Sequence, residues 1–128
     1  MSSSIAAFSQ TDKAQQYLRE AQQYNEQAAQ YERDAQQLME KANNYTRQAE
    51  NYAKKKDYNQ SRTYTNWAND AMSKAQLRLS WAKDARDKAK LRMKWAEDAM
   101  KKNRWIAGLY EFVDSLFPLW LYRGISRG

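Results

Sequence analysis

The sequence contains no cysteine and no histidine. Without thiols the chain can form neither a disulfide nor a thiolate metal site, and without imidazole it lacks the usual catalytic base and the commonest transition-metal ligand. Carboxylates, lysine, tyrosine and serine are the only candidates left for chemistry. We therefore expect a protein that is not an enzyme and that holds no metal and no cofactor.

Glycine and proline are almost as scarce, because the three glycines and the single proline all lie between residue 108 and the C-terminus. Nothing before that point breaks a helix. Alanine, glutamine, lysine, arginine, glutamate and methionine dominate the first 107 residues, and all of them favour helix, whereas β-branched residues are few. The composition predicts an all-α protein.

The net charge of +7 is distributed unevenly. Residues 1–52 carry five lysines and arginines against seven acidic residues, whereas residues 53–106 carry fifteen against six. A basic block of this kind attracts nucleic acid or an anionic membrane surface, pairs with an acidic partner helix, or serves as a solvated helix face. All four interpretations remain open at this point.

Two stripes of residues repeat every seven positions in the first half of the chain. One stripe consists of alanines, and the other, offset by three, consists of tyrosines with a single leucine. The stripes are Ala14, Ala21, Ala28, Ala35, Ala42 and Ala49, and Tyr17, Tyr24, Tyr31, Leu38, Tyr45 and Tyr52. This heptad pattern predicts a long coiled-coil helix, beginning near a capping box at Ser9 and Asp12, whose alanines let another backbone approach closely.

The heptad fails across residues 54–66, where weak helix formers gather. An alanine stripe then resumes out of phase with the first. Two architectures fit. In the first, residues 11–53 and 67–107 fold back on each other as a long helical hairpin; in the second, the chain continues as one extended coiled-coil helix with a slip in register. The similar lengths and opposite charges of the arms favour the hairpin, and the lack of glycine or proline in the turn opposes it.

The second arm repeats Trp-Ala every fourteen residues, at Trp67, Trp81 and Trp95. Its alanine stripe, which includes Ala82 and Ala89, is flanked alternately by tryptophan and lysine. Two interpretations compete for this alternation. The tryptophans are either packing knobs against a regular partner helix or stacking platforms for a polyanion, in which case the contacts are Trp67, Arg78, Trp81, Lys88, Arg92 and Trp95. The regular period favours packing, as do Asp70, Asp84 and Asp98, each of which lies four residues before a lysine.

Beyond Trp105 the chain becomes rich in leucine, phenylalanine and tryptophan. The apolar face consists of Ile106, Leu109, Val113, Leu116 and Phe117, followed by Trp120, and we expect Pro118 to end this short amphipathic helix. Glu111 and Asp114 argue against a membrane-spanning segment. Residues 106–122 are therefore predicted either to dock on a neighbouring subunit or to anchor at a membrane surface.

The alanine, glutamine and tyrosine heptads, the basic second half and the apolar end together resemble, in composition, the small internal virion proteins of short-tailed phages. The resemblance loosely covers residues 12–122 and assigns a role to no individual residue. It implies a largely helical, ring-forming protein that is ejected with DNA and lines a conduit through the cell envelope.

The pattern divides the chain into an N-terminal arm (1–10), an Ala/Tyr heptad helix (11–53), a turn or hinge (54–66), a basic Trp-repeat helix (67–107) and an apolar C-terminal helix and tail (108–128). Because alanine stripes cannot build a wide core in one chain, we expect a structural homo-oligomer, such as a ring, tube, filament or virion component, with no small-molecule substrate. Its predicted oligomer seam comprises Ala14, Tyr17, Ala21, Tyr24, Ala28, Tyr31, Ala35, Tyr45, Ala82 and Ala89. The N-terminus carries no signal peptide, so we expect a cytoplasmic protein or one within a virus particle.

Overall fold

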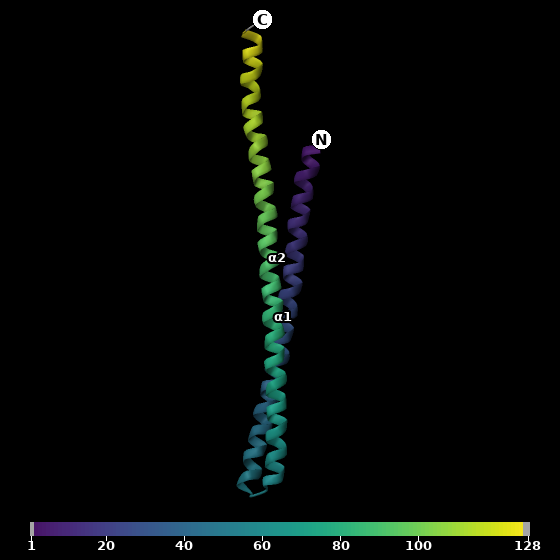
Figure 1. Cartoon of the computed structure of the whole chain (residues 1–128), viewed down its shortest axis with the longest axis vertical. Coiled ribbons are helices and arrows are strands. Elements are labelled where there is room, and N and C mark those ends of the chain that lie inside the picture. Colours follow the sequence, from purple (N-terminus) through teal and green to yellow (C-terminus); the bar gives the residue numbers. More distant parts are fainter. Residues whose placement is uncertain (1, 127–128) are drawn as a thin grey trace. The chain divides into compact units, whose positions relative to one another are not determined.

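In the computed structural model the chain consists of two α-helices, α1 (Ser2–Lys54) and α2 (Tyr58–Ser126), joined by a short turn (Figure 1). The structure describes the backbone of residues 2–126 and the side chains of residues 12–102, 104, 105, 108 and 109. The all-α prediction is confirmed, and no strand occurs within residues 2–126. Of the two predicted architectures, the hairpin is the one observed.

The two helices contribute to two compact units, of which residues Gln22–Ala89 form one. This hairpin unit contains the turn and the halves of α1 and α2 that adjoin it. The other unit combines Met1–Ala21 with Lys90–Gly128 and therefore holds the outer ends of both helices. We call it the end unit, and we describe the contacts of each unit separately.

The turn is built without glycine, by overlapping the caps of the two helices. Lys56 takes a left-handed backbone with φ of 62°, its N–H donates to the Ala53 carbonyl (2.9 Å), and the Asp57 N–H donates to the Tyr52 carbonyl (2.9 Å). These two bonds form the motif that commonly ends a helix at a glycine. The carboxylate of Asp57 then accepts from the Gln60 N–H (3.2 Å) and caps the start of α2.

The turn has no glycine or proline to mark it in the sequence, because a lysine takes the left-handed position. A side chain in this conformation costs about 1 kcal/mol, which two caps worth about 1 kcal/mol each offset. The chain reversal therefore needs only residues 55–57, whereas the predicted hinge spans residues 54–66. Residues 58–66 belong to α2, and within it the hydroxyls of Thr63 and Thr65 donate to the carbonyls four residues earlier, an arrangement that a helix accommodates.

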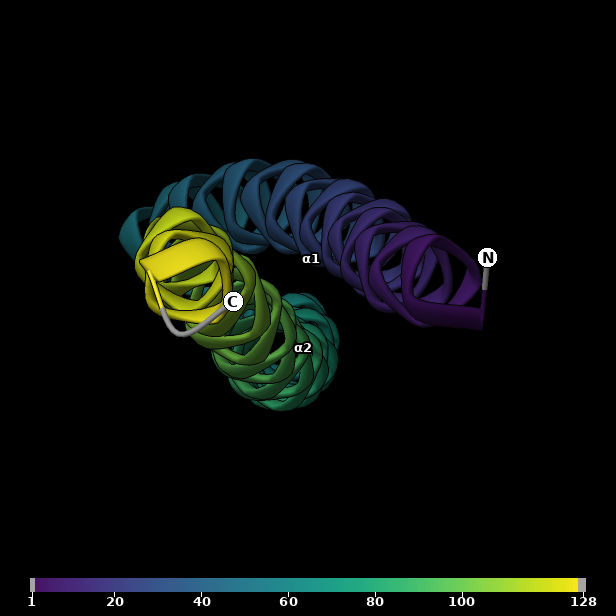
Figure 2. The same ribbon diagram turned by 90° about the horizontal axis from the view of Figure 1, so that it is seen from above.

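Three helix boundaries in the sequence prediction were wrong. The first helix begins at Ser2 rather than near Ser9, since the preceding residues contain no helix breaker. No separate C-terminal helix follows the basic arm, because α2 continues as one uninterrupted helix to Ser126 (Figure 2). Pro118 does not end it, because α2 continues through this position to Ser126 even though a proline cannot donate a backbone hydrogen bond.

Alanine fills the contact between the helices over the described residues. All fourteen side chains that are buried among the described residues are alanines, and they include both predicted stripes. In the hairpin unit Ala28 of α1 packs against Ala82 and Ala85 of α2, with Tyr31 at the edge of the cluster. Because a methyl group is the smallest apolar side chain, the two backbones can approach each other closely.

Next to the turn, serine replaces alanine in this pattern. Ser61 lies seven residues before Ala68, and its hydroxyl donates to the Ala49 carbonyl across the helices (2.8 Å). A side chain this small fits between close backbones, and its hydroxyl satisfies a carbonyl of the other helix. The small-residue line of α2 therefore extends one heptad further toward the turn than the alanines alone indicate.

Replacing Ala28 by leucine tests the close approach. The larger side chain overpacks the contact with Ala82 and Ala85, and we expect Ala28→Leu to destabilise the fold by about 1–3 kcal/mol in thermal or urea unfolding. Ala29→Leu is the matched control, since Ala29 is only partly buried. Equal stability of the two variants would contradict close packing at Ala28.

Candidate interaction surface

The predicted oligomer seam lies inside the chain. Its alanines are buried where α1 meets α2, and its tyrosines lie beside them on the same helix. In the hairpin unit the seam residues of α1 therefore face Ala82 and its neighbours on α2, and in the end unit Ala14, Ala96 and Ala99 are buried in the same way. A second copy of the chain would have to use a different surface.

Tyrosines of α1 and tryptophans of α2 form cross-helix pairs with one repeated geometry. In the hairpin unit the ring centroids of Tyr31 and Trp81 lie 5.6 Å apart at 65°, and those of Tyr45 and Trp67 lie 5.7 Å apart at 60°. These edge-to-face pairs each contribute about 0.5–1.5 kcal/mol beyond their burial. Each step of fourteen residues along α1 is matched by fourteen residues in the opposite direction along α2. The tryptophans therefore recur at the spacing at which tyrosines of α1 pack against α2.

The end unit contains the same pair. Tyr17 and Trp95 meet at 5.6 Å and 66°, again edge to face. Arg92 lies over the Trp95 ring at 4.3 Å and also forms an ion pair with Glu20 at 2.7 Å. In this unit a cation, an indole and a phenol therefore make one continuous contact between the helices.

Cations of the predicted polyanion contact are used in the same way in the hairpin unit. The guanidinium of Arg78 lies 4.3 Å from the centroid of Trp81, and the ammonium of Lys88 lies 5.8 Å from that of Tyr24. At the equivalent place near the turn, Tyr64 takes the position of the arginine and packs on Trp67 at 5.1 Å. These contacts agree with the packing interpretation of the tryptophan and lysine alternation, because the cations already face aromatic rings of their own chain.

Arg86 connects the two helices of the hairpin unit through charge. Its Nε and Nη2 donate to the two carboxylate oxygens of Glu32 (2.8 and 3.0 Å), and its Nη1 donates to Asn25 (3.4 Å). The hydrogen bond from Arg86 holds the pKa of Glu32 below its ordinary value of 4.5 and raises that of Arg86. A two-pronged pair of this kind has one good geometry, so it fixes the alignment of α1 against α2.

The sequence analysis did not predict the pairing of Arg86 with Glu32. The sequence does contain a signal for these pairs: Glu20 and Glu32 lie on the acidic arm, at positions that a hairpin places opposite Arg92 and Arg86. The pairs can be assigned only when the position of the turn is known, because the turn sets which residues of the two helices lie opposite each other. Of the three predicted Asp–Lys pairs within α2, Asp70–Lys74 is formed at 2.9 Å.

Large apolar side chains remain exposed on α2, on both sides of its contact with α1. One side, which we call the Trp flank, carries the tryptophans together with Leu77 and Leu91. The opposite side, the Met flank, carries Leu79, Met93 and Met100. Between 38% and 52% of each of these side chains is exposed, and only Trp105, at 69%, exceeds this range among the described tryptophans. Repeated exposure of this kind indicates an interaction surface.

Two of the shallow hollows on the Trp flank of the hairpin unit have equivalent linings. The first, of about 290 Å³, is lined by Gln27, Tyr31, Trp81, Asp84, Ala85 and Lys88, and the second, of about 270 Å³, by Leu38, Lys41, Tyr45, Trp67, Asp70, Ala71 and Lys74. Each position that lines the first hollow has a counterpart in the second, fourteen residues away along the same helix. Lys41 takes the place of Gln27, and Leu38 is added. The hollows are therefore repeats of one structural site.

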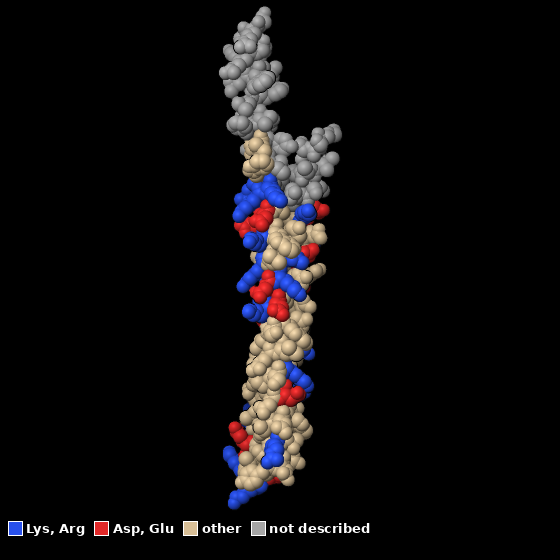
Figure 3. All heavy atoms as spheres, viewed as in Figure 1, with Lys and Arg blue, Asp and Glu red and all other residues tan. Residues whose placement is uncertain are grey.

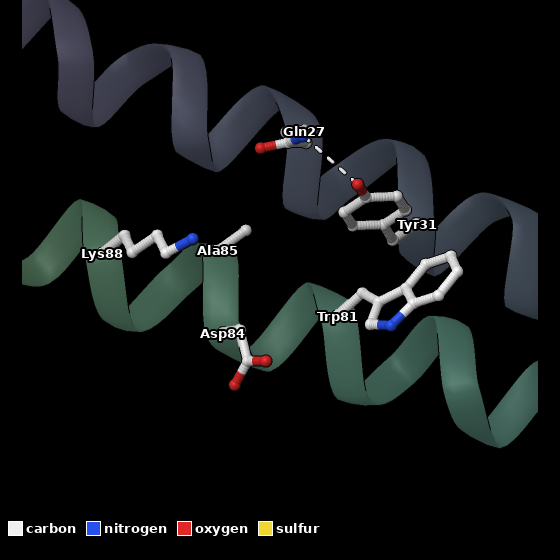
Figure 4. Close-up of a pocket in the computed structure, with 6 residues that line it drawn as sticks. All are labelled: Gln27, Tyr31, Trp81, Asp84, Ala85 and Lys88. Atoms are coloured by element: carbon white, nitrogen blue, oxygen red, sulfur yellow. Dashed lines mark hydrogen bonds between the residues drawn. The ribbon is translucent and has the colours of Figure 1, made fainter.

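The first hollow is drawn in Figure 4. Tyr31 and Trp81 approach each other at one end, Lys88 lies at the other, and Ala85 lies between them on α2. Gln27 donates to the Tyr31 hydroxyl (3.2 Å), while Asp84 points away from α1. The lining is an aromatic end, an alanine floor and a charged rim, which suits an apolar side chain flanked by polar groups.

Several predicted residues lie outside the described side chains. These are Ile106, Val113, Leu116, Phe117 and Trp120 of the predicted docking or membrane face. Leu109 is described and is exposed. No helix within the described residues has an apolar stretch long enough to cross a membrane.

Residues 12–102 and the few described beyond them contain no cluster of acidic side chains arranged to hold a metal ion. Comparison with known proteins found no matching family model, no similar curated protein and no similar solved structure. The function must therefore be argued from the surface.

The Glu32–Arg86 pair predicts a pH dependence. Because the pKa of Glu32 is lowered in the folded chain, the pair stabilises the fold above pH 4.5, and this contribution is lost as the pH falls through the lowered value. We expect Glu32→Gln to lower the melting temperature near neutral pH and to lose this difference from wild type below pH 4.5. Melting curves measured by circular dichroism across this range test it.

The matched control is Glu26→Gln, since Glu26 accepts a hydrogen bond only from Gln22 of its own helix in the described contacts. This control should follow the wild-type curve at every pH. A Glu32→Gln curve that also does so would contradict a stabilising role for the pair.

Proposed function

We propose that this chain is a non-enzymatic structural protein that self-assembles through helical coiled-coil surfaces. The observation that carries the proposal is the contrast between the interior and the exterior of the hairpin. Only alanines are buried among the described residues, while leucines, methionines and tryptophans of α2 are partly exposed. A soluble chain that works alone would place the larger side chains inside.

The energetics of burial support this proposal. A buried alanine methyl contributes about 0.8 kcal/mol, whereas a fully buried leucine or methionine contributes about 1.5–3 kcal/mol. The chain therefore leaves its most stabilising side chains unused in the hairpin. A partner helix against the Trp flank or the Met flank would bury them and would also stabilise the fold by mass action.

An assembly of copies fits the regularity of the surface. The exposed residues recur every fourteen positions, so one docking contact can be repeated along the helix by further copies or by one long copy. Such repetition is typical of rings, tubes and filaments, in which every subunit presents the same surface. The compositional resemblance to internal virion proteins of short-tailed phages is compatible with an assembly of this type.

Sedimentation equilibrium of the full chain tests the proposal. We expect an assembly at micromolar concentration that persists at high salt, because its contacts are mainly apolar. Dilution should lower the melting temperature, since assembly and folding are coupled. A monodisperse, well-folded monomer at the same concentration would rule out the proposal.

A second candidate function is binding of nucleic acid without sequence preference. Residues 90–105 of the end unit carry six lysines and arginines against two acidic residues, and Lys90, Lys94 and Arg104 are exposed. On the face drawn in Figure 3, however, acidic groups accompany the basic ones, so the surface is mixed in sign. Polyanion binding is for this reason secondary to self-assembly in our proposal.

Salt dependence of DNA binding tests the second candidate. If Lys90, Lys94 and Arg104 contact phosphates, the negative slope of log affinity against log salt should become shallower by about 2–3 when all three become glutamine. Fluorescence anisotropy of a labelled duplex measures it. The control replaces Lys13, Arg19 and Arg47 of α1, which should leave the slope nearly unchanged, and absence of any binding at low salt would remove this function.

A further inference from the structure

We infer that the Trp flank of the hairpin unit is a self-complementary docking surface, on which Leu77 of one copy occupies the hollow lined by Tyr31 and Trp81 of a second copy. This inference rests on the proposed self-assembly and names the surface and the partner that it would use. It is argued from the alternation of features along α2, from their charges and from the symmetry that the spacing allows.

Along α2 the Trp flank alternates every seven residues between an apolar pair and an Asp–Lys pair. Leu77 stands four residues before Trp81, so the two side chains are neighbours on one side of the helix, and 47% of Leu77 is exposed. Seven residues further on, Asp84 and Lys88 take the equivalent positions and the first hollow lies beside them. Seven residues before Leu77, Asp70 and Lys74 take these positions beside the second hollow.

Since Leu77 is separated from Asp84 by seven residues, it occupies the same side of α2. Asp84 points away from α1 (Figure 4). By heptad equivalence Leu77 also projects outward, in agreement with its exposure of 47%. Leu77 does not enter this hollow in its own chain, because Asp84, which lines the hollow, lies about 10 Å further along the helix. A neighbouring copy can receive it.

The spacing permits a two-fold symmetric pair. If two α2 helices lie antiparallel with Leu77 of each opposite Asp84 of the other, both copies insert a leucine and both receive one. The relation is reciprocal, as a two-fold interface requires. By residue number, the same alignment places Leu91 of one copy opposite Asp70 of the other, and Asp70 lines the second hollow.

The charge of the flank favours a second copy over a nucleic acid or a membrane. Each lysine of the flank is preceded four residues earlier by an aspartate, and Asp70–Lys74 forms an ion pair at 2.9 Å. The Asp70–Lys74 and Asp84–Lys88 pairs are thus neutral within a chain of net charge +7, so two copies can approach at these positions of α2 without repulsion. A polyanion would meet the aspartates, and a lipid surface would have to bury them.

The hollow also suits a leucine in size and lining. It offers about 290 Å³ over an alanine floor, with Tyr31 and Trp81 at one end. An inserted leucine would cover the exposed faces of both rings and leave the charged rim in water. This arrangement of an apolar anchor in a pocket with a polar rim is typical of energetic centres in protein interfaces.

Leu77→Gln is the first test, measured by sedimentation equilibrium of the full chain. We expect at least about a tenfold weaker self-association, because each copy loses one buried leucine. Leu79→Gln is the matched control: it lies two residues away, is 41% exposed and belongs to the Met flank, so its self-association should equal that of wild type. Circular dichroism verifies that both variants keep their helix content.

Filling the hollow is the second test. Gln27→Trp places a large side chain on its rim without changing the buried alanines, and it should weaken association as much as Leu77→Gln does. Gln23→Trp, at an exposed position of the same helix that does not line the hollow, is the control. An unchanged association of Gln27→Trp would overturn the inference.

Cross-linking tests the alignment, since the chain has no cysteine of its own. We expect a mixture of Leu77→Cys and Asp84→Cys chains to form more mixed disulfide dimers than either variant forms with itself, because the opposed residues differ by seven positions, about 10 Å of helix. Predominant self-pairing of either variant would overturn the antiparallel alignment.

The outcomes separate this inference from the proposed function. If wild type is monomeric, both fail. If wild type assembles but Leu77→Gln assembles equally well, or Leu79→Gln is equally impaired, self-assembly stands and the Trp flank is not the docking surface.

Discussion

The close approach of two helices through alanine is the constraint on which the rest of this structure depends. A methyl-only interior keeps the backbones near each other, and it moves every larger side chain to the edges of the contact. Tyrosine and tryptophan then meet at the edge, where a ring can cover the alanines and still reach water with its polar atom. The exposed flanks of α2 are a direct result, because the interior has no room for leucine or methionine.

Charge and aromatic contacts supply the specificity that alanine lacks. A row of methyl groups would tolerate a shift of one heptad, since every seventh residue is the same. The pair of Glu32 with Arg86 has no equivalent one heptad away in the hairpin unit, and the tryptophans recur only at every second heptad. These features allow one alignment of α1 and α2, and the overlapping caps at residues 55–57 fix where it begins.

Much of this arrangement could be predicted from periodicity, because both alanine stripes that the heptads indicated are buried. The stripes could not reveal their partner, since an alanine line looks the same whether it meets another chain or its own second half. The turn at Lys56 was hidden by its left-handed lysine, which carries no compositional signal. The hollows were equally unpredictable, because each combines residues of two helices whose alignment depends on that turn.

The paired fourteen-residue repeat has a consequence for how such a chain can change in length. Removing or duplicating one repeat from α1 together with one from α2 would return every remaining ring, methyl group and cation to a partner of the same kind, whereas a change in a single helix would mismatch all contacts beyond it. Each matched pair of repeats that is added or removed changes the length of both helices by about 21 Å. Two tandem duplications, one in the segment that encodes α1 and one in the segment that encodes α2, would therefore alter the reach of this protein without altering its chemistry.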